Sequence, residues 1–207
     1  MMTVLENHEL IAKISSHGAE LHSLYDKTTK TEYIWQGDKT YWPWHAPICF
    51  PITGRVHNDE YIFEDKKYML TVHGFARDYE FSLLKKTENS VIYELIYNDE
   101  SLKVYPFKFS LQLEYVLLED GLKVNYTVKN LEDANKDIFF ALGLHTAYNC
   151  PLEKTDDFED YELIFEQKET AKRHFLTNGI INNETEDILN NENTLAEKLP
   201  CSFLFSS

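Results

Sequence analysis

The nonapeptide FKFSLQLEY, residues 107–115, shows the clearest alternation of apolar and polar side chains in the sequence. Every odd position is apolar and every even position is polar, so a strand here has one buried face and one face in water. A Glu-Asp-Gly turn signal follows at residues 119–121, and residues 122–129 then alternate again. This pattern predicts a large antiparallel β-hairpin.

Two-residue alternation also dominates the chain from residue 3 to about residue 130, with little sustained helical periodicity. We expect further strands at residues 9–15, 19–26, 31–35, 61–64, 67–70, 80–85, 91–97 and 137–144, with another candidate at 160–166. The fold class is therefore predicted to be all-β and antiparallel, a sandwich rather than a barrel. A closed barrel would give more even strand spacing and no proline-rich interruption.

Residues 38–60 interrupt this rhythm with three prolines, Pro43, Pro47 and Pro51, which cannot lie inside a central strand. The segment is predicted to be a long aromatic-rich loop, and loops of that length in compact domains are usually functional. Residues 168–193 are rich in Asn, Glu and Thr and show no clear periodicity. Residues 197–205 match neither a strand with a partner nor a capped helix.

The composition suits a single globular domain spanning residues 1–207, with 43% hydrophobic and 14% aromatic residues. The formal charge of −15 argues against a nucleic-acid partner or an anionic membrane, because both bind positive surfaces. Cys49, Cys150 and Cys201 share no spacing typical of a disulfide framework or a zinc site. With no apolar signal core at the N-terminus and no apolar run long enough to cross a bilayer, the expected location is the cytoplasm.

Three segments outside the hairpin carry residue types suited to acid–base chemistry on a sugar. They read FPITGR at residues 50–55, VHGFARD at 72–78 and GLHTAY at 143–148. Imidazole suits proton transfer because its pKa lies near neutral pH, and an arginine fork can hold sugar hydroxyl groups in register. A neutral sugar also binds through aromatic faces, for which the candidates are Trp42, Trp44, Phe75 and Tyr148.

Each of these residues also has a structural interpretation. A lone histidine at a strand end, such as His145, is more often structural than catalytic, and only the three segments together favour a site. Arg55 could anchor the long loop to a carboxylate, and Arg77 with Asp78 fits an ion pair or loop brace better than a site. No His-x-His pair with a nearby carboxylate occurs, so no metal site is expected. The remaining histidines expected at the surface are His8, His17, His22, His57 and His174.

On these three segments, in this order and spacing, the chain resembles the aldose 1-epimerase (galactose mutarotase-like) family, up to about residue 195. The resemblance implies a β-supersandwich and interconversion of the α and β anomers of an aldohexose such as galactose or glucose, with no cofactor. It places His145 at the position of the catalytic acid and His73 at a second active-site histidine. It also makes Arg55 a substrate-contacting arginine and Tyr148 an aromatic residue of the sugar site.

One departure from the family pattern leaves the functional prediction open between alternatives. The family's general base is a glutamate on a late strand, and nothing in residues 190–207 matches that region, so the domain is expected to be incomplete at its C-terminus. The intact histidines favour a mutarotase, whereas the unmatched glutamate favours a sugar-binding protein without catalysis. A third alternative is an unstable fold, because a sandwich without its last strands exposes apolar faces and strand edges.

Overall fold

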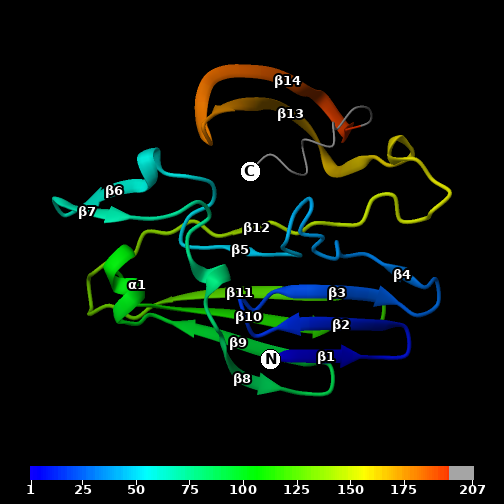
Figure 1. The fold of residues 1–207 in the computed structure, drawn as a ribbon, viewed down its shortest axis with the longest axis horizontal. Helices are drawn as coiled ribbons and strands as arrows, with labels where there is room; N and C mark the ends of the chain where they lie inside the picture. The colour runs from blue at the N-terminus through cyan, green and yellow to red at the C-terminus, as the bar shows by residue number, and fades with distance from the viewer. Residues whose placement is uncertain (196–207) are drawn as a thin grey trace. The chain divides into compact units, whose positions relative to one another are not determined.

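Antiparallel strands make up most of the regular structure in this computed structural model, which describes residues 1–195 (Figure 1). The chain divides between Tyr148 and Asn149 into two compact units. No helix within residues 1–195 is both long enough and apolar enough to span a membrane. The predicted all-β, antiparallel fold class is confirmed.

The first unit contains two four-stranded sheets. One sheet has the order β1-β2-β3-β4, with strands at Met2–Glu6, Leu10–Ser15, Leu21–Asp26 and Thr31–Glu32. The other has the order β11-β10-β9-β8, with strands at Leu122–Asn130, Phe109–Leu117, Ser90–Ile96 and Ser82–Lys86. Two small ladders complete the unit, formed by β5 (Ile48–Cys49) with β12 (Gly143–Leu144) and by β6 (Glu60–Phe63) with β7 (Lys66–Met69).

The predicted hairpin is the pair β10 and β11, which stay in one register along their whole length. The odd-numbered residues of β10 are all buried, whereas Gln112, Glu114 and Val116 are half-buried. The alternation in the sequence therefore identifies the face of the strand that meets the core. Burying a side chain as large as that of Leu111 stabilises the fold by about 1.5–3 kcal/mol.

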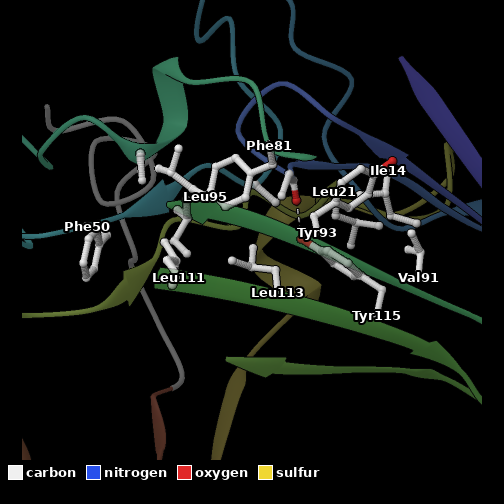
Figure 2. Packing of buried hydrophobic residues seen from close by; sticks show 14 of the residues in the cluster. Ile14, Leu21, Phe50, Phe81, Val91, Tyr93, Leu95, Leu111, Leu113 and Tyr115 are labelled. Carbon is white, nitrogen blue, oxygen red and sulfur yellow. Dashed lines mark hydrogen bonds between the residues drawn. The ribbon is translucent and has the colours of Figure 1, made fainter. Parts of the chain in front are cut away.

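The core of the first unit lies between the two four-stranded sheets, whose side chains meet in one cluster. Figure 2 shows Ile14 and Leu21 from one sheet close to Tyr93 and Tyr115 from the other. Two buried phenols also join the layers by hydrogen bonds. Tyr93 Oη lies 2.7 Å from Thr3 Oγ1, and Tyr115 Oη donates to the carbonyl of Ala19 over 2.7 Å. These contacts give the sandwich arrangement that the alternation predicted.

In the first unit one local prediction was wrong and one element was not predicted. Residues 137–144 were expected to form a strand, but only Gly143–Leu144 does so. Phe139 and Phe140 are both exposed, and the backbone of Ala141 donates to the Pro51 carbonyl rather than to a sheet. The chain also contains an unpredicted helix, α1, at Asp99–Val104. A reciprocal capping box between Asn98 and Ser101 explains why six residues without helical periodicity form it.

The described part of the second unit contains a two-stranded ribbon of β13 (Leu163–Thr177) and β14 (Ile180–Leu195). A short 3₁₀ turn at Phe158–Asp160 precedes the ribbon. The candidate strand at 160–166 is therefore partly right, whereas residues 168–193 form most of the ribbon although they lack a two-residue periodicity. The two-residue turn Asn178-Gly179 has positive φ at both positions, as a type I′ hairpin requires. The prediction for residues 197–205 lies outside the described residues.

Candidate active site

The backbone around His73 is folded tightly against the loop that begins at Phe50. His73 has φ +65° and Gly74 has φ +72°, so two consecutive residues adopt the left-handed conformation. Phe50 N–H donates to the His73 carbonyl over 3.1 Å, and His73 N–H donates to the Gly54 carbonyl over 2.8 Å. A Cβ at position 74 would lie 2.2 Å from the Phe50 carbonyl oxygen, which makes glycine necessary there.

His145 is held by an extension of the small β5–β12 ladder. Its backbone N–H donates to the Pro47 carbonyl over 3.1 Å, and Ala147 N–H donates to the His45 carbonyl over 2.9 Å. These two bonds continue the antiparallel register in which Leu144 faces Ile48. The long loop predicted at residues 38–60 therefore lies directly beside the segment that carries His145.

The structure brings His73 and His145 together. Their ring centroids are 5.3 Å apart, and the rings meet edge to face at 72°. The Trp42 ring lies 5.0 Å from that of His145, and the Trp44 ring lies 5.7 Å from that of Trp42. Two imidazoles and an aromatic wall thus form one continuous surface from three separate chain segments.

One hydrogen bond determines which nitrogen of His73 is free to act. Gly54 N–H donates to His73 Nδ1 over 3.1 Å, so Nδ1 is an acceptor and the neutral ring carries its hydrogen on Nε2. Burial lowers the pKa of His73 below its usual value, and the nearby His145 and Arg77 lower it further. His73 is therefore held as a neutral imidazole with an Nε2–H donor.

Arg77 lies closer to the histidines than the sequence indicated. Its terminal nitrogen donates to the Val72 carbonyl over 3.1 Å, and its guanidinium stacks over Trp44 at 5.0 Å. Its contact with Asp78 is long, at 3.9 Å. The loop-brace interpretation thus agrees with the Val72 contact, but the charge also acts on His73 and on the buried Cys49, whose pKa burial raises.

The other two predicted site residues have different surroundings. Arg55 Nε lies 3.0 Å from Asp59 Oδ1, which matches the alternative that Arg55 anchors its loop to a carboxylate. Tyr148 is 62% exposed and pairs with Ile34 through an isolated bridge. It lines a hollow of about 590 Å³ together with Tyr33. Within residues 1–195, Tyr148 makes no ring contact with the two imidazoles.

A buried carboxylate beside the site was missed altogether. Glu20 accepts hydrogen bonds from the backbone N–H groups of His45 and Ala46, and its other oxygen lies 3.0 Å from His22 Nε2. His22 was expected at the surface, yet it stacks on His45 with centroids 4.1 Å apart. The sequence holds no signal for this cluster, because its members meet only through the path of the long loop.

Comparison with known proteins identifies the family. The family model described as aldose 1-epimerase matches residues 1–198. The chain belongs to the aldose 1-epimerase family. The resemblance seen in the three sequence segments is therefore confirmed.

Several proteins of known sequence or structure are similar to most of this chain. The chromosomal protein LacX of Lactococcus lactis subsp. lactis is 37% identical over an alignment of 176 residues that covers 82% of this chain and 58% of LacX. A galactose mutarotase related enzyme from Lactobacillus acidophilus superposes with a TM-score of 0.88 at 34% identity, covering 96% of this chain and 65% of that one. A galactose mutarotase-like protein from Lactobacillus casei gives a TM-score of 0.83 at 40% identity, covering 94% of this chain and 67% of that one. The chain thus spans somewhat more than half of LacX.

Proposed function

We propose that this aldose 1-epimerase family member interconverts the α and β anomers of an aldohexose by acid–base catalysis without a cofactor. The observation that carries the proposal is the edge-to-face pair of His73 and His145, with centroids 5.3 Å apart beside the Trp42 ring. A neutral sugar ring requires polar groups for its oxygens and an aromatic face for its C–H surface, and this surface supplies both.

Mutarotation opens the sugar ring and closes it on the other face of the anomeric carbon. A base takes the proton of the anomeric hydroxyl while an acid protonates the ring oxygen, and ring closure reverses both transfers. We assign the acid role to His145. His73 is its partner, because its Nε2–H is a fixed donor and its Nδ1 is occupied by Gly54. A proton transfer of this kind contributes about 10² to 10⁴-fold in rate.

Substrate binding is assigned to Arg55 and Tyr148. A guanidinium fork can hold sugar hydroxyl groups in register, and Arg55 carries such a fork beside Asp59. Tyr148 offers an exposed ring as a stacking face. In this proposal Arg55 both anchors its loop to Asp59 and binds the sugar, because the Asp59 contact also sets the direction of the guanidinium group.

A second candidate function is sugar binding without catalysis. Within residues 1–195, neither His73 nor His145 forms a hydrogen bond or ion pair with a carboxylate. In the mutarotase proposal the base is therefore a group that forms no such bond to either imidazole. If no base reaches the anomeric hydroxyl, the same two imidazoles bind the sugar and leave its anomers unchanged.

Polarimetry on freshly dissolved α-galactose and α-glucose separates the two functions. We expect the parent chain to exceed the buffer rate, and His145→Ala to lower the catalysed rate by about 10² to 10⁴-fold. The matched control is His17→Ala, because His17 is an exposed histidine that contacts Glu80 and does not line the hollow beside Tyr148. A parent chain that matches buffer alone contradicts the mutarotase proposal. Sugar binding in a parallel calorimetric titration then supports the second candidate.

A further inference from the structure

Glu20 is a buried carboxylate that is fixed on both its backbone and its side chain. Its side chain is 10% exposed, and its carbonyl accepts from Ser15 N–H over 2.8 Å. The preceding carbonyl, that of Ala19, accepts from the buried hydroxyl of Tyr115 over 2.7 Å. The carboxylate thus projects from a backbone held by both sheets of the core.

The Glu20 side chain binds the long loop at two consecutive backbone N–H groups. Its Oε1 accepts from His45 over 2.8 Å and from Ala46 over 3.0 Å. Its Oε2 lies 3.0 Å from His22 Nε2, and the His22 ring stacks on His45. Burial by itself raises the pKa of Glu20, but the hydrogen bonds from His22, His45 and Ala46 lower it overall, so the group is a carboxylate at neutral pH.

The segment that Glu20 fixes is the same segment that holds His145. The carbonyls of His45 and Pro47 accept from the backbone N–H groups of Ala147 and His145. The His45 ring adds a further bond, because Nδ1 lies 2.7 Å from the Trp35 carbonyl and must donate to it. The Glu20 carboxylate is therefore linked to the backbone of His145 by two hydrogen bonds. One runs from Ala46 N–H to Glu20, the other from His145 N–H to the Pro47 carbonyl, and the backbone of residues 46–47 joins them.

We propose that Glu20 is a positioning residue for His145, acting through the backbone of residues 45–47. The inference rests on the proposed function for its kinetic consequence, but the placement of the ring can be measured without turnover. Removing the carboxylate leaves two buried N–H groups and one imidazole without their acceptor. The loop then shifts to satisfy them, and His145 moves with the loop.

The experiment compares Glu20→Ala with Glu20→Gln in the full chain. Glutamine keeps an oxygen at Oε1 for the two N–H groups, so it should rescue the position of the loop. The matched control is Glu132→Ala, since Glu132 is also a shielded carboxylate that accepts a backbone N–H, from Lys108 over 2.7 Å. The readouts are the imidazole NMR signals of His145 and His73, identified with His145→Ala and His73→Ala, together with kcat and KM for mutarotation.

We expect Glu20→Ala to shift the His145 and His73 signals and to lower kcat by about 10- to 100-fold with a small change in KM, because small displacements of a reacting group act mainly on kcat. Glu20→Gln and Glu132→Ala should keep the parent signals. Unchanged His145 and His73 signals in a folded Glu20→Ala overturn the proposal. If Glu20→Ala does not fold, Glu20→Asp replaces it, and parent-like signals there have the same meaning. If the parent chain has no activity, the NMR signals still decide the positioning role, so the two proposals fail separately.

Discussion

Strands β10 and β13 both carry phenylalanine and leucine, yet they place these side chains in opposite environments. In β10 the apolar residues occupy alternate positions, and all of its odd-numbered residues are buried. In β13 they occur as neighbours, with Leu163, Ile164 and Phe165 at one end and Phe175 and Leu176 at the other. All five of these β13 side chains are exposed. Consecutive residues of a strand point to opposite faces, so a one-sided core cannot bury such a run.

The two strands are consequently stabilised by different interactions. β10 pairs with β9 and β11 and also buries its apolar face against the other sheet. The contacts of β13 include the backbone ladder with β14 and side-chain pairs across it, such as Arg173 with Glu186. Exposed ion pairs of that kind contribute about 0–1 kcal/mol. We therefore expect substitutions in the first unit to cost far more stability than equivalent substitutions in the ribbon.

The largest difference should come from truncating a core aromatic residue. Phe109 of β10 is fully buried and lies 5.0 Å from Phe50 and 5.8 Å from Tyr105, measured between ring centroids. We expect Phe109→Ala to lower the free energy of unfolding by about 3–5 kcal/mol, because it removes apolar contacts and leaves a cavity. Chemical denaturation followed by tryptophan fluorescence measures this directly, since all three tryptophans lie in the first unit. Phe109→Leu is the control and should cost distinctly less; a loss below about 1 kcal/mol for Phe109→Ala contradicts the comparison.

A slightly smaller loss is expected from adding one methyl group beside His73. Gly74→Ala combines a positive φ with a Cβ only 2.2 Å from the Phe50 carbonyl, and we expect a loss of about 2–4 kcal/mol. Two other glycines separate the causes. Gly54 has φ +79° but open space around it, so Gly54→Ala should cost about 1–2 kcal/mol from backbone strain alone. Gly121 has neither feature, and an effect of Gly121→Ala as large as that of Gly74→Ala would show that the contact with Phe50 is not the cause.

The same contrast explains how much of the fold could be predicted from the sequence. The β10–β11 hairpin was predictable because burial on one face leaves a two-residue pattern. The β13–β14 ribbon leaves no such pattern, and its local signal in the sequence is the Asn178-Gly179 pair, which is typical of a type I′ turn. The expected strand at 137–144 failed for a related reason, since its phenylalanines Phe139 and Phe140 are exposed.

The candidate site was predictable only where side chains act through local motifs. His73 and His145 were identified from their own segments, and the structure brings them together. Glu20 could not be identified in this way, because its partners are backbone N–H groups of a loop 25 residues further along the chain. Backbone hydrogen bonds between distant segments have no signature in residue types.

Acidification should weaken the first unit through Glu20. The pKa of Glu20 in the folded protein lies below its ordinary value of 4.5, so the carboxylate stabilises the fold above pH 4.5. This stabilisation is lost as the pH falls below 4.5 and through the folded pKa, because protonation removes the charged acceptor of His22, His45 and Ala46. We expect the stability advantage of the parent over Glu20→Gln to shrink across this range in fluorescence-monitored denaturation. A difference that stays constant down to pH 3 would show that the charge of Glu20 contributes nothing.

The smallest effect is expected from truncating an apolar residue of the ribbon. Ile164 is 68% exposed and lies between two other exposed apolar residues, so Ile164→Ala removes little buried surface and leaves no cavity. We expect the free energy of unfolding to change by less than about 0.5 kcal/mol, the range typical of surface substitutions. Circular dichroism and amide hydrogen exchange at residues 163–195 are the appropriate measurements, since tryptophan fluorescence reports only the first unit. A loss approaching that of Phe109→Ala would mean that Ile164 is buried in solution, and that the ribbon's apolar residues are covered by contacts absent from residues 1–195.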